Sequence, residues 1–181
     1  YAGVLRVCCT AAPLSIRYRM DGIAAIRDPD GVPADMTDPV RADFTHGLPL
    51  TVRWGEMDAL GHVNNTVYYR YSEDGRIDYF SQLLATGEPF HETGPILAEL
   101  GCQFRQQLRF PAEIEITTRT HRIGRSSMGV QQALWCREDG ELVALMDAVL
   151  VWFDYRAQTS VAVPDALRER IRTFEVVSPA M

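Results

Sequence analysis

One stretch decides the fold that we expect for this 181-residue chain: Trp54-Gly55-Glu56-Met57-Asp58-Ala59-Leu60-Gly61-His62-Val63-Asn64-Asn65. A helix follows directly, because Asn64 or Asn65 can serve as its N-cap. Small and aromatic side chains then recur at three- and four-residue spacing, at Tyr68, Tyr71, Gly75, Tyr79 and Leu83. We therefore expect one long helix from the asparagine pair to about Leu84.

The loop and the start of this helix together suggest chemistry on a carbonyl group. Backbone N–H groups in a first helical turn have no acceptor within the helix and lie at the positive end of its dipole, so they can stabilise an oxyanion. A nearby carboxylate such as Asp58 could attack the carbonyl or activate water. The same residue types also cap helices, form turns and make ordinary loop hydrogen bonds, as a lone His62 usually does. Spacing alone leaves both interpretations open.

Alternating side chains on both sides of the stretch predict β-strands. Before the loop, Leu50, Val52 and Trp54 alternate with Thr51 and Arg53. Four further strands follow the helix, over about residues 96–104, 114–120, 130–136 and 142–153. In the first of these, one face would carry Ile96, Ala98, Leu100, Cys102 and Phe104. The last strand is apolar on both faces, so it should be central.

Turn residues join these strands into an antiparallel sheet. Gly124 and Asp139-Gly140 stand where hairpins need residues that accept a positive φ. Gly75 costs the long helix about 1 kcal/mol relative to alanine, which predicts that another element comes close there. A short helix over residues 165–174 follows, with Pro164 near its first turn. The predicted fold class is α+β, with one long helix against one face of an antiparallel sheet.

The first 46 residues show no sustained period, so we expect an irregular N-terminal extension or linker before a domain over residues 47–181. Residues 1–20 hold three arginines and no acidic residue, as organellar transit segments do. Cys8-Cys9 and Pro13, however, interrupt a continuous amphipathic helix there. We therefore expect a cytoplasmic protein whose extension is dispensable for chemistry.

The composition argues against several classes of protein. The chain has 46% hydrophobic and 23% charged residues, as globular domains do, and its pI is about 5.2. A net charge of −6 argues against a nucleic-acid partner, which normally needs clustered positive charge. The most hydrophobic run, residues 142–153, is broken by Asp147 and is too short for a membrane span. All 18 basic residues are arginine, which excludes lysine chemistry. Four cysteines without metal-type spacing predict reduced, mostly buried thiols.

The residues around the opening stretch resemble those of a known family. The matching segments are Arg53–Asp58, Gly61–Asn65, Tyr68-Tyr69, Glu73–Arg76, Phe104-Arg105, Leu108–Phe110, Gly124–Ser127 and Val151–Asp154. Over about residues 48–180 the chain resembles the hotdog-fold acyl-CoA thioesterases of the 4-hydroxybenzoyl-CoA thioesterase family, especially the long-chain acyl-CoA branch with its His-Val-Asn-Asn motif. The resemblance implies a hotdog fold, in which an antiparallel sheet of about five strands wraps around one long helix.

The resemblance also implies roles for residues. Asp58 would be the catalytic carboxylate, as nucleophile or general base, and Asn65 would offer its backbone N–H to the thioester oxygen. His62 and Asn64 match the motif and would shape the loop or orient water. The reaction would convert acyl-CoA to a free acid and CoA, with no metal and no redox cofactor.

For the coenzyme, the resemblance points to one hairpin turn. Arg122, Arg125, Ser126 and Ser127 surround the turn that in relatives lies near the nucleotide end, and guanidinium groups suit phosphate. Arginines beside a turn can equally be solvated. The active site would lie between two subunits of a homodimer, or of a tetramer of dimers.

Several alternatives stay open at this point. If Asp58 does not act, Glu56 or Glu73 is the next candidate carboxylate. Acyl carrier protein thioesters are a variant substrate. A hotdog enoyl-CoA hydratase would pair Asp58 with His62, although the surrounding sequence looks unlike that branch. A non-catalytic acyl-CoA binding module would keep the groove and tolerate the loss of Asp58.

Overall fold

The computed structural model of the chain describes residues 14–19, 38–84 and 92–180, with the backbone alone for residues 14–19. Its strands form one antiparallel sheet in the order β1-β3-β6-β5-β4-β2, with β7 paired to β6. The strands are β1 (Leu14–Arg19), β2 (Leu48–Thr51), β3 (Thr93–Phe104), β4 (Glu113–Ile123), β5 (Ser127–Cys136), β6 (Leu142–Asp154) and β7 (Thr159–Ser160). The prediction that the strand over residues 142–153 is central is confirmed.

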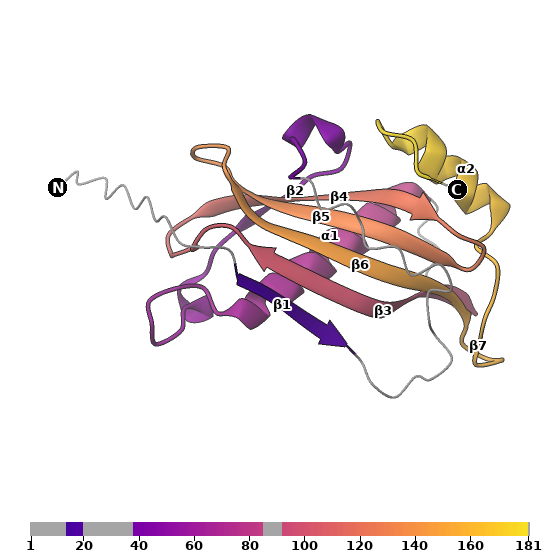
Figure 1. Cartoon of the computed structure of the whole chain (residues 1–181), viewed down its shortest axis with the longest axis horizontal. Coiled ribbons are helices and arrows are strands. Elements are labelled where there is room, and N and C mark those ends of the chain that lie inside the picture. The colour runs from indigo at the N-terminus through magenta and orange to yellow at the C-terminus, as the bar shows by residue number, and fades with distance from the viewer. Residues whose placement is uncertain (1–13, 20–37, 85–91, 181) are drawn as a thin grey trace.

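The helical elements are η1 (Arg41–Asp43) and η2 (Trp54–Glu56), both 3-10 helices, α1 (Asn65–Leu84) and α2 (Asp165–Phe174). α1 crosses one face of the sheet and lies behind it in Figure 1. The residues that define its predicted period are all buried: Tyr68, Tyr71, Gly75, Tyr79 and Leu83. This confirms the long helix, the α+β class and the hotdog arrangement of a sheet curled around one helix.

Gly75 marks the closest approach of α1 to the sheet. A Cβ atom at this position would lie 2.9 Å from Gln132 Nε2 and 3.0 Å from Ile116 Cγ2. Gln132 also donates to Ser72 O and to Thr118 Oγ1, each at 3.0 Å, and accepts a hydrogen bond from Ser72 Oγ at 2.5 Å. A side chain at position 75 would therefore push α1 away from β4 and β5, as the sequence predicts.

The strand before the motif is shorter than expected. β2 ends at Thr51 and Val52 is buried, but Trp54 is 74% exposed and lies in η2. The reason is local, because Glu56 N–H donates to Arg53 O at 3.0 Å and Met57 N–H to Trp54 O at 3.3 Å. These turn bonds end the alternation before Trp54 can join the buried face.

β3 departs from the predicted alternation at a bulge. Its register against β6 shifts between Leu97 and Glu99. Leu100 is buried after the bulge, whereas before it Leu97, and not Ile96, packs against the core. One extra residue moves the following side chains to the opposite face, so the predicted five-residue face is wrong before the bulge.

Only one of the two predicted turn glycines has the expected conformation. Gly140 has φ +76°, as the hairpin between β5 and β6 requires. Among the described residues the other glycine with positive φ is Gly61, not Gly124. The turn at Gly124 is closed instead by its N–H, which donates to Ser127 O at 2.8 Å.

The structure also differs from the sequence analysis in the first 46 residues. β1 pairs antiparallel with β3, from Leu14 opposite Phe104 to Arg19 opposite Glu99. An edge strand is held by main-chain hydrogen bonds and needs no periodic burial, which is why no pattern predicts it. The division into an extension and a domain stays a prediction.

α2 begins and ends at the predicted residues and packs at the C-terminal end of α1. Arg170 Nη1 donates to Leu84 O at 2.9 Å, which satisfies a carbonyl at the end of α1. Cys102 is a free, buried thiol whose pKa burial raises to about 12. Cys8 and Cys9 lie outside the described residues.

Candidate active site

The loop between η2 and α1 is a small closed turn. Met57 and Val63 form an antiparallel bridge. Inside it, Asp58 N–H donates to His62 O at 2.7 Å and Gly61 N–H donates to Asp58 O at 3.1 Å. Gly61 has φ +78°, a conformation that a residue with a Cβ atom rarely adopts. The glycine thus lets the chain reverse within the motif.

Asp58 is half-buried in this turn. Its Oδ1 accepts hydrogen bonds from the backbone N–H groups of Leu60, at 2.8 Å, and His62, at 3.3 Å. Asp58 therefore does stabilise the turn, as its residue type allows. Both bonds use the same oxygen, and a carboxylate has a second one with which it can act as base or nucleophile.

The start of α1 settles which asparagine is the cap. Asn64 Oδ1 accepts from Thr66 N–H at 2.9 Å and from Thr66 Oγ1 at 2.8 Å. Asn64 is therefore the N-cap, and Asn65 is the first residue of α1. The backbone N–H of Asn65 belongs to the first turn, whose N–H groups have no acceptor within the helix.

His62 contacts an arginine that the sequence analysis did not single out. Arg109 Nη2 lies 2.7 Å from His62 Nε2. A guanidinium only donates, so His62 Nε2 is the acceptor of this hydrogen bond. The neighbouring chain also contacts the loop, because Val63 N–H donates to Leu108 O at 2.8 Å. Segment 108–110 thus forms a second wall of the motif.

Exposed aromatic side chains flank this wall. The rings of Trp54 and Phe110 pack edge to face with their centroids 5.7 Å apart, although Trp54 is 74% and Phe110 41% exposed. Phe110 N–H also donates to Met57 Sδ at 3.3 Å. Aromatic surface therefore lies beside the polar turn that carries Asp58.

A groove of about 330 Å³ runs along α1 beside β3. Tyr69, Arg70, Glu73 and Arg76 line it from the helix, and residues 97–100 line it from β3. Asn65, Tyr69 and Glu73 are spaced four residues apart, so they share one helix face and the groove starts one turn from Asn65. Burial lowers the pKa of Arg76, which donates to Ser72 Oγ.

The predicted coenzyme residues lie elsewhere in the same chain. Arg125 is exposed, Ser126 half-buried and Ser127 buried, in the turn between β4 and β5. Arg168 of α2 holds this turn by donating from Nη2 to Arg125 O at 2.8 Å. The turn therefore lies at the α2 end of α1, and α1, with 20 residues, is about 30 Å long. One chain does not bring Arg125 and Asp58 together.

Comparisons with known proteins show the family. Residues 52–171 match the thioesterase-like superfamily. The chain belongs to that superfamily. A thioesterase from Thermus thermophilus, crystallised with coenzyme A and zinc, is 31% identical, with a TM-score of 0.64 over 74% of this chain and 96% of that one.

Two curated relatives extend the comparison. An Arabidopsis thaliana protein named acyl-acyl carrier protein thioesterase ATL2, chloroplastic, is 26% identical over 72% of this chain and 70% of its own length. The Bacillus subtilis protein YsmA is 31% identical over 49% of this chain, and the match spans only 59% of that relative. The superfamily match, the Thermus thermophilus thioesterase and the Arabidopsis thioesterase together support a thioester hydrolase.

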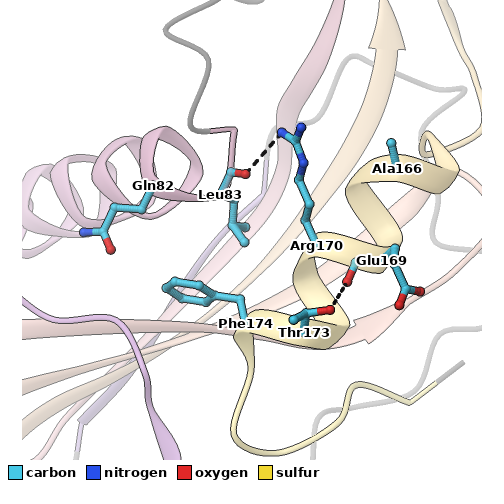
Figure 2. A pocket seen from close by; sticks show the side chains of 7 residues that line it. All are labelled: Gln82, Leu83, Ala166, Glu169, Arg170, Thr173 and Phe174. Carbon is cyan, nitrogen blue, oxygen red and sulfur yellow. Dashed lines mark hydrogen bonds between the residues drawn. The ribbon is translucent and has the colours of Figure 1, made fainter.

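A second pocket of this superfamily member lies far from the Asp58 loop. It measures about 650 Å³ and is lined by Gln82, Leu83, Ala166, Glu169, Arg170, Thr173 and Phe174, between the end of α1 and α2 (Figure 2). Its size does not make it the candidate site, because it lies at the opposite end of α1 from Asn65.

The described part of the chain also bears on metal binding and on membrane insertion. No three His, Cys, Asp or Glu side chains gather there so as to hold a metal ion. None of the described helices is long and apolar enough to cross a membrane.

Proposed function

We propose that the protein hydrolyses acyl-CoA thioesters to a free acid and CoA at the loop before α1. One observation carries this proposal: the half-buried carboxylate of Asp58 lies in a closed turn seven residues before Asn65, the first residue of α1, whose backbone N–H belongs to the first helical turn. A base or nucleophile and an oxyanion donor are the two groups that thioester hydrolysis needs.

As a general base, Asp58 would take a proton from water while the water oxygen attacks the thioester carbonyl carbon. The Asn65 N–H would donate to the oxyanion that forms. The tetrahedral intermediate would then expel CoA as a thiolate, which breaks the C–S bond and leaves the free acid. As a nucleophile, Asp58 would attack the same carbon, expel the thiolate and form an anhydride that water hydrolyses.

His62 and Asn64 support this arrangement in different ways. Asn64 caps α1 and so places the Asn65 N–H. His62 donates its backbone N–H to Asp58, and its ring accepts a hydrogen bond from Arg109. We assign both residues to shaping the site.

We further propose that the active unit is a homodimer, or a tetramer of dimers. In one chain the Arg125 turn is separated from the Asp58 loop by the length of α1, and a two-fold partner would bring one chain's turn to the other's loop. Among the described residues, β1 pairs with β3 only over residues 99–104, so residues 93–98 of that edge can accept a neighbouring strand.

The test is a hydrolysis panel of acyl-CoAs of varied chain length, with CoA thiol release as the measurement. We expect release with at least one chain length and a dimer or tetramer by sedimentation. An active monomer would contradict the shared site. If none of the acyl-CoAs releases thiol but an acyl carrier protein thioester does, the substrates belong to a second class, the acyl carrier protein thioesters.

That second class has one observation in its favour. The Arabidopsis relative, matched over 70% of its own length, is named for acyl-acyl carrier protein substrates. The panel therefore includes an acyl carrier protein thioester with the same acyl group as one of the acyl-CoAs. The ratio of the two kcat/KM values decides between the classes.

A further inference from the structure

Glu56 accepts three hydrogen bonds from residues around the candidate site. Its Oε2 accepts hydrogen bonds from Arg53 N–H at 2.7 Å and from the Tyr71 hydroxyl at 2.6 Å. Its main-chain oxygen accepts from Asn64 N–H at 2.9 Å. One residue thus contacts the chain before the loop, the helix cap after it and the body of α1.

These contacts lie on both sides of the reacting groups. Asp58 follows Glu56 by two residues, and Asn65 follows Asn64 by one. The Glu56–Asn64 bond closes the base of the loop, and the Glu56–Tyr71 bond ties that base to the second turn of α1. The separation between the Asp58 carboxylate and the Asn65 N–H therefore depends on a ring of covalent and hydrogen bonds that passes through Glu56.

Tyr71 is a suitable anchor for this ring. It is 4% exposed, and its ring packs against Tyr68 with centroids 6.4 Å apart. Burial, together with the hydrogen bond to Glu56, raises the pKa of Tyr71, so its hydroxyl stays protonated and donates. The proton of this hydroxyl is thereby committed to Glu56 rather than to a substrate.

We infer that Tyr71 and Glu56 are positioning residues, which set the Asp58 carboxylate and the Asn65 N–H at the separation that hydrolysis needs. The inference rests on the proposed function. A misplacement of about 1 Å can cost a factor of about 100 in rate, although the reacting groups themselves are intact.

The chain provides a matched control on the same helix. Eight residues after Tyr71, the Tyr79 hydroxyl donates to Glu175, in a cluster with Thr120 at the other end of α1. Tyr71→Phe and Tyr79→Phe each remove one hydroxyl and one tyrosine–glutamate hydrogen bond while keeping the ring. Only the first bond lies in the ring around the candidate site.

The experiment measures kcat and KM of wild type and of both variants on an acyl-CoA and on a simple thioester without the nucleotide. For Tyr71→Phe we expect kcat to fall about 10- to 100-fold on both substrates, with KM within about twofold. For Tyr79→Phe we expect a lower Tm and an unchanged kcat. Glu56→Gln keeps an oxygen acceptor for both donors, so it should retain most of the wild-type kcat, whereas Glu56→Ala should not.

The outcomes separate the inference about Tyr71 and Glu56 from the proposed function. An active wild type with unchanged kcat in folded Tyr71→Phe, or an equal loss of kcat in Tyr79→Phe, overturns the inference and leaves the proposed function standing. A wild type without hydrolysis on any thioester overturns both. If Tyr71→Phe does not fold, Glu56→Gln against Glu56→Ala makes the same comparison, and equal kcat in these two variants counts against the inference.

Discussion

The two ends of α1 carry the same pair of side chains in different surroundings. At the Asn65 end, Tyr71 donates to the half-buried Glu56 beside a polar turn that faces solvent. At the α2 end, Tyr79 donates to Glu175, which is 7% exposed and also accepts from Thr120 N–H at 2.7 Å. The first pair fixes a loop, and the second closes the core.

The α2 end includes buried polar atoms that lack hydrogen-bond partners within the described part of the chain, which lowers the stability of the folded state. Among the described residues, Glu175 Oε2 and His46 Nδ1 are buried without a hydrogen-bond partner. Burial raises the pKa of Glu175 and lowers the pKa of His46, because each charged form loses its hydration. The same tyrosine–glutamate hydrogen bond therefore serves positioning where water is near and packing where it is not.

The largest effect that we expect is at the Asn65 end. Asp58→Asn keeps the shape of the side chain but can neither attack nor take a proton, so kcat should fall at least about 100-fold while the variant stays folded. Thioester hydrolysis measures the fall in kcat, and the CD spectrum shows whether the variant is folded. A folded variant with half the wild-type rate would remove Asp58 from the mechanism and point to Glu73, since Glu56 is engaged by Tyr71.

The next effect tests whether the α2 end serves the coenzyme. Arg125→Ala should raise KM for acyl-CoA about 10- to 100-fold, because a charge-assisted hydrogen bond contributes about 1.5 to 3 kcal/mol. A thioester without the nucleotide should be hydrolysed equally by both proteins, since it lacks the remote group. An equal loss of activity on both substrates would show that Arg125 has a structural role. No loss of activity on either substrate would show that Arg125 is only a solvated surface residue.

A substitution between the two ends should affect stability alone. Gly75→Ala places a Cβ atom 2.9 Å from Gln132 Nε2 and 3.0 Å from Ile116 Cγ2. Such overpacking typically costs about 1 to 3 kcal/mol, of which the better helix propensity of alanine offsets about 1 kcal/mol. We expect thermal unfolding to show a lower Tm, with kcat close to wild type. A loss of kcat without a loss of Tm would mean that the middle of α1 takes part in positioning.

The smallest effect concerns pH at the buried end. The pKa of Glu175 is raised in the folded state, so its contribution is full below the unfolded pKa and is lost as pH rises through the folded pKa. Glu175→Gln keeps an acceptor without the charge. At neutral pH its Tm should match or exceed that of wild type by a few degrees, since about 1 kcal/mol shifts Tm by about 2 to 4 °C at this size.

His46 supplies the opposite slope and therefore a control. Its folded pKa is lowered, so stability is lost as pH falls below its unfolded value of 6.5, in wild type and in Glu175→Gln alike. Tm measured across pH in both proteins separates the two groups. A gap between them that grows as the pH falls would contradict the assignment to Glu175.

The local elements could be predicted because their signals lie within a few residues of one another. The period of Tyr68, Tyr71, Gly75, Tyr79 and Leu83 decided the buried face of α1. An asparagine at the helix start and a proline before α2 marked ends that the structure reproduces. The family motif marked the Asp58 loop, whose place before a helix needed no knowledge of the sheet.

Other features were decided only in the folded chain, because they depend on which backbone or side chain lies opposite. The bulge in β3 appears only against β6, and β1 is a strand only because β3 offers an edge. Glu56 and Tyr71 are 15 residues apart, and nothing in their types or spacing shows that they meet. The sequence by itself determined the two α-helices and the strands β2 to β6, through local periods and caps, and the family resemblance marked the motif. The tertiary structure alone decided the registers, the distance between the Asp58 loop and the Arg125 turn, and the bond that ties Glu56 to α1.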